Sequence, residues 1–353
     1  MAYTTIDDPS AHFQTALWTG DGNSTQAITN DGNSDLQPDF VWLKRRNGVE
    51  NHTLADTSRG VTKRISSNEN NAEDTNGIAS VQSDGFTVSS SYNGNASGST
   101  YVGWQWKANG GTTSSDSNGD QTSTVQANTT AGFSIATFSA SSSAGQTVGH
   151  GLGSAPDMYI WKSRARADNW YIYHRSTGAG GYLRLNTTDA FTSNSNVWSN
   201  TDPSSTIIYY GGNSLTNNNE NHVLYSFKSI QGYSKFGSYT GNANADGPFI
   251  YTGFKPTWLL IRNTKAGEGW MLHDAKVDEE GGNGTAGNPR ERRFQVNENQ
   301  AEVGTTTAFD FVSNGFKLRT DTGSHNGSGD SIIYMAFAEH PFVSSKGVPV
   351  TAR

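Results

Sequence analysis

Pro38-Asp-Phe-Val-Trp-Leu-Lys44 is the stretch that decides the fold, because the chain repeats its pattern twice more. In each copy a proline opens a short apolar run that ends in a basic residue, and the other two copies are Pro156-Asp-Met-Tyr-Ile-Trp-Lys162 and Pro256-Thr-Trp-Leu-Leu-Ile-Arg262. Apolar runs of this length, bounded by proline and charge, are typical of buried β-strands. Self-similarity along a chain indicates one structural unit used repeatedly.

A second strand follows each of these runs at a fixed distance. Counting 14 residues on from the proline reaches His52, Trp170 and Trp270, and counting 16 on reaches Leu54, Ile172 and Leu272. Because both positions have the same parity, their side chains point to one face of a strand. Short apolar stretches centred on Ile65, Leu183 and Phe294 predict a third strand in each unit.

The two ends of each unit are repeated as well. Interleaved small and aromatic residues predict closing strands at 101–106, 222–227 and 334–339. Opening strands are predicted at Phe133 and Tyr233, which lie at equal distances before their prolines, with Phe13 as the N-terminal counterpart. Asp84-Gly85 and Asn314-Gly315 predict tight turns in which glycine has a positive φ, and the middle unit lacks this turn.

These patterns predict an all-β protein of three tandem β-sandwich repeats, jelly-roll-like or immunoglobulin-like, at 1–118, 119–231 and 232–353. The length favours two or three domains over one compact core. The Gly/Ser/Thr-rich residues 108–130 are expected to be a linker at the end of the first repeat. Because the second junction, at 228–232, is shorter, repeats two and three are expected to pack more rigidly than repeats one and two.

Composition excludes several classes of function. The net charge of −7 argues against nucleic acid as the main partner, and the basic runs at 44–46 and 290–293 are interpreted as solvated strand ends. The absence of cysteine excludes disulfides, thiol nucleophiles and cysteine-ligated zinc. Without a basic leader or a long apolar run, the chain is expected to be soluble and made without a signal peptide.

No sequence signature of an enzyme is present, and we predict no catalytic residue, cofactor or metal. The eight histidines are scattered and are interpreted as surface or structural residues. The loops Asp21–Asn23 and Asn30–Asn33 have oxygen ligands in a pattern that also suits calcium, although turns favour the same residues. Four aromatic residues are least explained by the strand pattern and are candidates for binding a ligand or partner, with core packing as the alternative: Trp18, Trp198, Tyr209 and Tyr210.

Several stretches resemble virion structural proteins of tailed bacteriophages, in particular tail-fibre-like and particle-surface proteins of marine and cyanobacterial phages. They are Gln146–Pro156, Ser313–Leu318, Ile333–Glu339 and Gly347–Arg353. The resemblance covers essentially the whole chain and is densest from Tyr233 to Arg353. It is specific for the family and implies no catalytic residue, since family members are mostly described only as structural.

The resemblance implies a non-enzymatic virion protein, made in the host cytoplasm and assembled as a symmetric oligomer with other virion proteins. A tail-associated fibre or adaptor component is the leading expectation. Three alternatives stay open: a capsid-surface decoration protein, a carbohydrate-binding receptor module that grips host-surface glycan, and a depolymerase. Neither nucleic-acid binding nor membrane insertion is expected.

Overall fold

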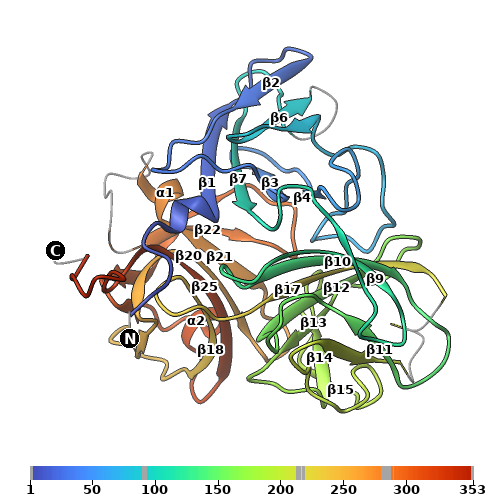
Figure 1. Ribbon diagram of the computed structural model, residues 1–353. Coiled ribbons are helices and arrows are strands. Elements are labelled where there is room, and N and C mark those ends of the chain that lie inside the picture. Colours follow the sequence, from blue (N-terminus) through green and yellow to red (C-terminus); the bar gives the residue numbers. More distant parts are fainter. Residues whose placement is uncertain are drawn as a thin grey trace.

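The structure, a computed structural model, describes residues 3–89, 94–211, 216, 219–279, 288 and 290–350 (Figure 1). Strands account for 44% of it and helices for 3%, which confirms the all-β prediction. The strands form several sheets, one of them nearly closed into a barrel. No helix in these ranges is long and apolar enough to cross a membrane.

The chain forms three segments, coloured blue to cyan, green to yellow and orange to red in Figure 1. The first comprises β1 (Phe13–Thr19), β2 (Thr25–Ile28), β3 (Phe40–Arg45), β4 (Thr53–Asp56), β5 (Ser80–Val81), β6 (Phe86–Ser89) and β7 (Thr100–Trp106). The second comprises β8 (Ser114–Asp116), β9 (Ser123–Asn128), β10 (Phe133–Ser139), β11 (Gln146–Gly149), β12 (Met158–Ser163), β13 (Tyr171–His174), β14 (Gly181–Arg184), β15 (Thr192–Ser193), β16 (Ile207–Tyr210) and β17 (Asn221–Phe227). The third comprises β18 (Ser234–Thr240), β19 (Phe249–Tyr251), β20 (Phe254–Asn263), β21 (Trp270–Asp274), β22 (Arg290–Gln295), β23 (Val303–Val312), β24 (Gly315–Leu318) and β25 (Ser331–Pro341). The helices are short: η1 (Pro9–Ala11), α1 (Ala275–Glu279) and α2 (Gly323–Asn326).

All three segments contain the same run of antiparallel neighbours. The opening strand pairs with the closing strand, which pairs with the proline-led strand and then the second strand: β1-β7-β3-β4, β10-β17-β12-β13 and β18-β25-β20-β21. The cross-strand register is also shared, since the residues 4 and 16 positions after each proline face each other: Trp42 and Leu54, Ile160 and Ile172, Leu260 and Leu272. The opening strand of the third segment is one residue off the predicted position, because Ser234 rather than Tyr233 lies opposite Phe337.

Both faces of each proline-led strand are buried, and successive side chains point to opposite faces. The residues 3 and 5 positions after the proline pack inside their own segment: Val41 and Leu43, Tyr159 and Trp161, Leu259 and Ile261. The residues 2 and 4 positions after it all join one large cluster, which we call the shared core: Phe40 and Trp42, Met158 and Ile160, Trp258 and Leu260. The repeated run therefore makes two kinds of core at once.

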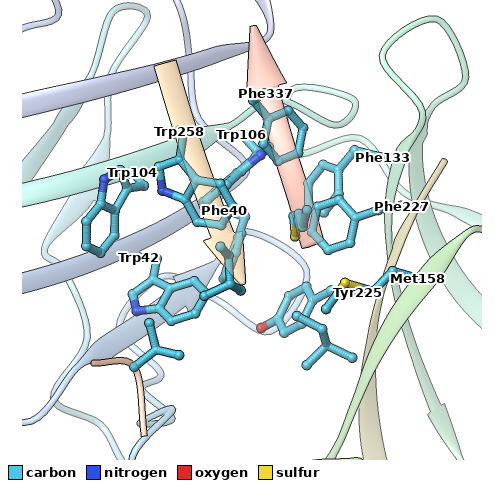
Figure 2. Packing of buried hydrophobic residues seen from close by; sticks show 14 of the residues in the cluster. Phe40, Trp42, Trp104, Trp106, Phe133, Met158, Tyr225, Phe227, Trp258 and Phe337 are labelled. Carbon is cyan, nitrogen blue, oxygen red and sulfur yellow. The ribbon is translucent and has the colours of Figure 1, made fainter. Parts of the chain in front are cut away.

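The shared core takes side chains from all three segments (Figure 2). At its centre Trp106 of β7, 1% exposed, has ring centroids of Phe227 and Trp258 at 6.4 and 5.6 Å. The expectation that a single core is unlikely is therefore wrong for this part of the interior. The period-2 pattern identified buried strands, but it carries no information on whether a buried face meets its own segment or another.

The predicted linker is also wrong in part. Ser114–Asp116 and Ser123–Asn128 are strands β8 and β9, and β9 pairs along the outer edge of β10. Val125 packs in the core of the second segment, and the Gln126 side chain donates to the hydroxyl oxygens of Thr57 and Ser58 in the first. The sheet of the second segment thus begins before the predicted boundary at 118. Small residues suit this strand, although their composition resembles a linker.

The two glycine turns differ from each other. Gly85 has φ +98°, as predicted, but Gly315 does not adopt a positive φ. A Cβ atom on either glycine would lie 2.0 Å from the carbonyl oxygen of a facing residue, Ile28 or Ile250. Close approach of the paired strand, rather than backbone conformation alone, is the shared reason for glycine at these sites.

Candidate functional site

The basic residue that ends each repeated run is buried, not solvated. Lys44, Lys162 and Arg262 are at most 1% exposed, and each donates to the carbonyl oxygen of the next residue, over 2.9, 2.9 and 2.6 Å. Burial lowers the pKa of Lys44 and of Lys162 to about 8. The interpretation of the run at 44–46 as a solvated strand end is therefore wrong for Lys44 and for Arg46, which is 8% exposed. These bases fasten the loops that follow the strands.

Those loops join each segment to a neighbour through equivalent backbone hydrogen bonds. The carbonyl oxygen 8 residues after each proline accepts an amide from another segment: Arg46 from Glu302, Arg164 from Glu73, and Thr264 from Phe191. We call each such contact between two segments a seam. In every seam a second amide of the loop donates to the carbonyl oxygen three residues before the first donor: Glu50 to Asn299, Asp168 to Asn70, and Gly267 to Thr188. The first segment meets the third, the third meets the second, and the second meets the first. The three seams therefore close a ring.

Two of the three seams also carry ion pairs. Arg164 holds both carboxylate oxygens of Glu73 at 3.0 Å, and Glu73 also accepts from the fully buried Arg59 guanidinium at 2.9 Å. Arg46 pairs with Glu302 at 2.6 Å in the corresponding place. A buried pair of this kind is costly to break, because removing one member leaves a charge without compensation.

We expect Glu73→Gln to lower the free energy of unfolding by about 2 kcal/mol, since Arg164 loses its carboxylate and the fully buried Arg59 keeps only that of Asp56. Urea denaturation at neutral pH measures the change. Asp189→Asn is the matched control, because Asp189 pairs with Arg184 but its side chain is 50% exposed. That control is expected to cost less than about 1 kcal/mol, and an equal loss in both variants would contradict a special role for the seam.

Another set of equivalent positions, 18 residues after each proline, bonds to the closing strand of a neighbouring segment. Asp56 accepts from the Tyr225 hydroxyl at 2.7 Å, and Asp274 accepts from the indole N–H of Trp104 at 2.9 Å. The imidazole Nε2 of His174 lies 3.3 Å from the Tyr334 carbonyl oxygen. Burial raises the pKa of Asp274 and lowers that of His174 to about 4. These titratable groups serve contacts between segments.

The four aromatic residues singled out from the sequence do not form one surface site. Trp198 and Tyr210 are fully buried in the core of the second segment, where both rings contact Trp161 at 5.9 and 5.1 Å. Trp18 is half-buried, stacks on Tyr101 at 5.3 Å and donates its indole N–H to the Gly94 carbonyl oxygen. Tyr209 is half-buried on β16. For Trp198 and Tyr210 the core-packing alternative describes what the structure shows.

We expect Trp198→Ala to destabilise the protein rather than act on a ligand directly. Removing a fully buried indole costs about 3–5 kcal/mol through lost contacts and the cavity that remains. Thermal and urea unfolding measure the loss, with Tyr209→Ala as a partly exposed control expected to cost less. Unchanged stability together with lost ligand binding would restore Trp198 as a binding residue.

The carboxylates of the two candidate calcium loops already have partners. Asp21 accepts from the Asn23 amide and from the side chain of Asn95, and Asp31 pairs with Lys276. Within the described ranges no three His, Asp or Glu side chains gather as a group that could hold a metal ion. The geometry of these loops therefore gives no support to the hypothesis that they bind calcium.

Three pockets of the described surface are small, with volumes of about 180, 180 and 220 Å³. One of about 180 Å³ lies where β1 meets the third segment and is lined by polar side chains that include Gln14, Lys276 and Glu339. Ligand sites usually enclose about 300–1,000 Å³. Glu339 pairs with Lys255 at 2.7 Å, so one acid of this pocket is already neutralised.

An exposed aromatic pair on β19 is the feature that the sequence reasoning missed. Phe249 and Tyr251 are each 48% exposed and, two residues apart on one strand, point to the same side. The Lys235 ammonium lies 5.3 Å from the centre of the Tyr251 ring and donates to the Tyr251 carbonyl oxygen at 2.8 Å. The Tyr3 hydroxyl lies 3.0 Å from that of Tyr251. The stretch Phe249-Ile250-Tyr251 predicts a strand, but all three side chains are apolar or aromatic. The sequence therefore does not show that Phe249 and Tyr251 face outward and Ile250 inward.

Fold and site together define an all-β protein of several sheets, with an aromatic core shared by the three segments and buried polar groups at the contacts between them. The chain belongs to the DUF7483 family, described as a domain of unknown function, which matches residues 8–341. No curated protein and no solved structure matched the chain.

Proposed function

We propose that the chain is a non-enzymatic structural protein of a tailed-bacteriophage virion, built from three copies of one β-sandwich unit. The repeated strand order and register support three copies of a unit: the first two segments each have a larger and a smaller sheet, and the third has one eight-stranded sheet that begins at β18 and ends at β19. The sequence resemblance supports the virion assignment. Within it, a tail-associated fibre or adaptor that assembles as a symmetric oligomer is the leading role, and a capsid-surface decoration protein is the alternative.

The closed ring of seams is the observation that carries the structural role. Backbone hydrogen bonds, the buried acids Asp56 and Asp274, and aromatic side chains of the shared core such as Trp106 connect one segment to another. A particle component exposed outside the host must keep its shape. This chain has no cysteine, so no disulfide can contribute to that stability. An interior fastened at three equivalent seams meets that need.

Electron cryomicroscopy of particles that carry a tagged copy tests the location. Density for the tag on the tail supports the fibre or adaptor role, whereas density over the capsid lattice supports decoration. Particles that lack the protein altogether would contradict the virion assignment. Incubation with host capsule or lipopolysaccharide, followed by a reducing-end assay, is expected to release no product, and released sugar would favour a depolymerase.

Carbohydrate binding is a second candidate function, which the exposed pair Phe249 and Tyr251 favours. Exposed rings offer apolar faces on which sugars stack, with a charged neighbour available for hydroxyl groups. A glycan array with the wild-type chain and Phe249→Ala/Tyr251→Ala tests it. Loss of glycan binding in the double variant would support a carbohydrate-binding receptor module. If the wild-type chain binds no host polysaccharide, this candidate function is contradicted.

A further inference from the structure

The second segment covers the open edge of its sheet with its own chain. Strand β9 runs along the outer edge of β10, with Asn128 opposite Phe133 and Thr124 opposite Thr137. We call residues 114–128, which comprise β8 and β9, the insert. Just before β9 the insert also contacts β11 of the smaller sheet, where Gln121 bridges to Val148. The insert therefore lies in the gap between the opening strand β10 and strand β11.

The third segment has the same gap, between β18 and β19. Ser234 occupies the place of Phe133, because each lies opposite the equivalent closing-strand residue, Phe337 or Phe227. Within the described ranges β18 and β19 are the two terminal strands of their sheet. The Lys235 side chain crosses between them to the Tyr251 carbonyl oxygen, and at one end Thr4 bonds to Gln231, before β18, and Tyr3 bonds to Tyr251. In the second segment a strand spans the corresponding gap.

The exposed aromatic pair stands where the insert lies in the second segment. Val148 and Ile250 are equivalent, since each packs in the core of its own segment and pairs with a later strand of that segment, β16 for Val148 and β24 for Ile250. Phe249 and Tyr251 therefore correspond to Thr147 and Gly149. The insert contacts both: Asp120 bonds to the Thr147 amide and hydroxyl, and the Ser123 hydroxyl donates to the Gly149 carbonyl oxygen at 2.8 Å.

In the first segment the chain also protects its opening strand, by a different means. The side chain of Gln14 on β1 accepts from the Gly32 amide and donates to the Ser34 carbonyl oxygen, which holds the loop 31–34 against the strand. Two of the three opening strands are thus covered by a strand or a loop. The third is covered only at its start, where Ile230 bridges to Ser234 and the Ser229 hydroxyl accepts from the Phe236 amide, and no strand is paired along Gly237–Thr240 on that side among the described residues.

We propose that the β18–β19 gap is a docking site for an extended segment of a partner protein, which adds as a strand along β18 and packs against Phe249 and Tyr251. The chemistry of the segment follows from β9, Ser123–Asn128, in which Ser123, Val125 and Ala127 alternate on the inward side. The partner strand has small or β-branched residues at alternate positions and no charge on that side. Strand addition of this kind obtains affinity from main-chain hydrogen bonds and specificity from alternate side chains. The site deepens the proposed scaffold role, because it gives the scaffold a defined partner contact.

Hydrogen exchange of the full-length protein with a synthetic peptide of residues 121–130 tests the proposal. At saturating peptide, the outward amides of Ser238 and Thr240 on β18 are expected to exchange at least tenfold more slowly, whereas the alternate amides that already bond to β25, and those of β10, are unchanged. The same peptide with Val125→Pro is the control, because proline cannot complete the ladder. Phe249→Ser/Tyr251→Ser is expected to weaken peptide binding at least tenfold, and Val49→Ser, an exposed apolar residue elsewhere, is expected to leave it unchanged.

Four results would overturn this inference. They are unchanged exchange in β18, equal binding by the double variant, protection of β18 by an oligosaccharide but not by peptide, and protection that rises with protein concentration alone. The last two identify a glycan or a second copy as the occupant. The peptide assay uses purified protein, so its failure is distinguishable from a failure of the virion assignment, which imaging of particles decides.

Discussion

Acidification from pH 7 to pH 5 is expected to lower the free energy of unfolding by on the order of 10 kcal/mol. Six histidines are fully or almost fully buried, and burial lowers the pKa of each: to about 4 for His174, to about 3 for His222 and His325, below the ordinary value for His150, and well below it for His52 and His273. In the unfolded chain an imidazole titrates near pH 6.5. Between that pH and the folded-state values the unfolded chain binds more protons, so stability falls as the pH falls.

The hydrogen bonds of these rings require the neutral form. The indole N–H of Trp42 donates to Nδ1 of His52, and that of Trp161 donates to Nδ1 of His222, both at 2.9 Å. A proton on either Nδ1 would remove the acceptor. Each of the five histidines other than His150 contributes about 2 kcal/mol of lost stability between pH 7 and pH 5, so these five contribute on the order of 10 kcal/mol, and His150 adds to the loss. The raised pKa of Asp278, about 6 through burial, offsets only about 1 kcal/mol.

Guanidinium denaturation at pH 7, 6 and 5 measures this loss. His222→Gln keeps an acceptor for Trp161 and is expected to reduce the pH-dependent loss by about 2 kcal/mol. His340→Gln is the matched control, because the side chain of His340 is 41% exposed, and it should leave the pH dependence unchanged. Constant stability down to pH 5 would show that these imidazoles are accessible to water.

Trp106→Ala is expected to lower the free energy of unfolding by about 5 kcal/mol, the upper end of the range for a buried indole. Its ring lies 4.9 Å from that of Phe13 and 5.7 Å from that of Phe337, so both its own segment and the third lose packing. The indole nitrogen has no hydrogen-bond partner among the described residues, so the loss is one of packing. Because the core is shared, unfolding is expected to remain a single transition.

Hydrogen exchange locates the effect of this change. In Trp106→Ala, exchange is expected to rise together in β3, β10 and β25, one strand from each segment. In Trp198→Ala, which opens a core inside the second segment, the rise is expected to be largest in β12 and β16. Separate unfolding transitions for the three segments would contradict a shared core and favour independent tandem sandwiches.

Much of the secondary structure could be predicted from the sequence, because the repeated proline-led run fixes both strand position and parity. Trp42 and Leu54 pair as their spacing predicts, and so do their counterparts in the other two segments. The shared core could not be predicted, because alternation shows that a face is buried but not against what. Likewise, Val125 was the only large apolar residue in a polar stretch, and tertiary packing made a strand of it.

The candidate site was less accessible to sequence reasoning. Trp198 and Tyr210 attracted attention because they lay outside the repeated pattern, yet both pack against Trp161 of the pattern itself. Phe249 and Tyr251 are exposed because the third segment lacks the insert that the second has. That difference becomes visible only when equivalent strands are aligned in space.

The three seams are equivalent in geometry but are encoded separately, within one gene. In a homotrimer, a substitution at a subunit boundary appears three times, whereas here it alters a single seam. The chain shows such divergence, since Thr264 and Phe191 stand where the other two seams have arginine and glutamate. Each seam can therefore change in sequence without altering the other two, so the three sides of the ring need not present the same surface.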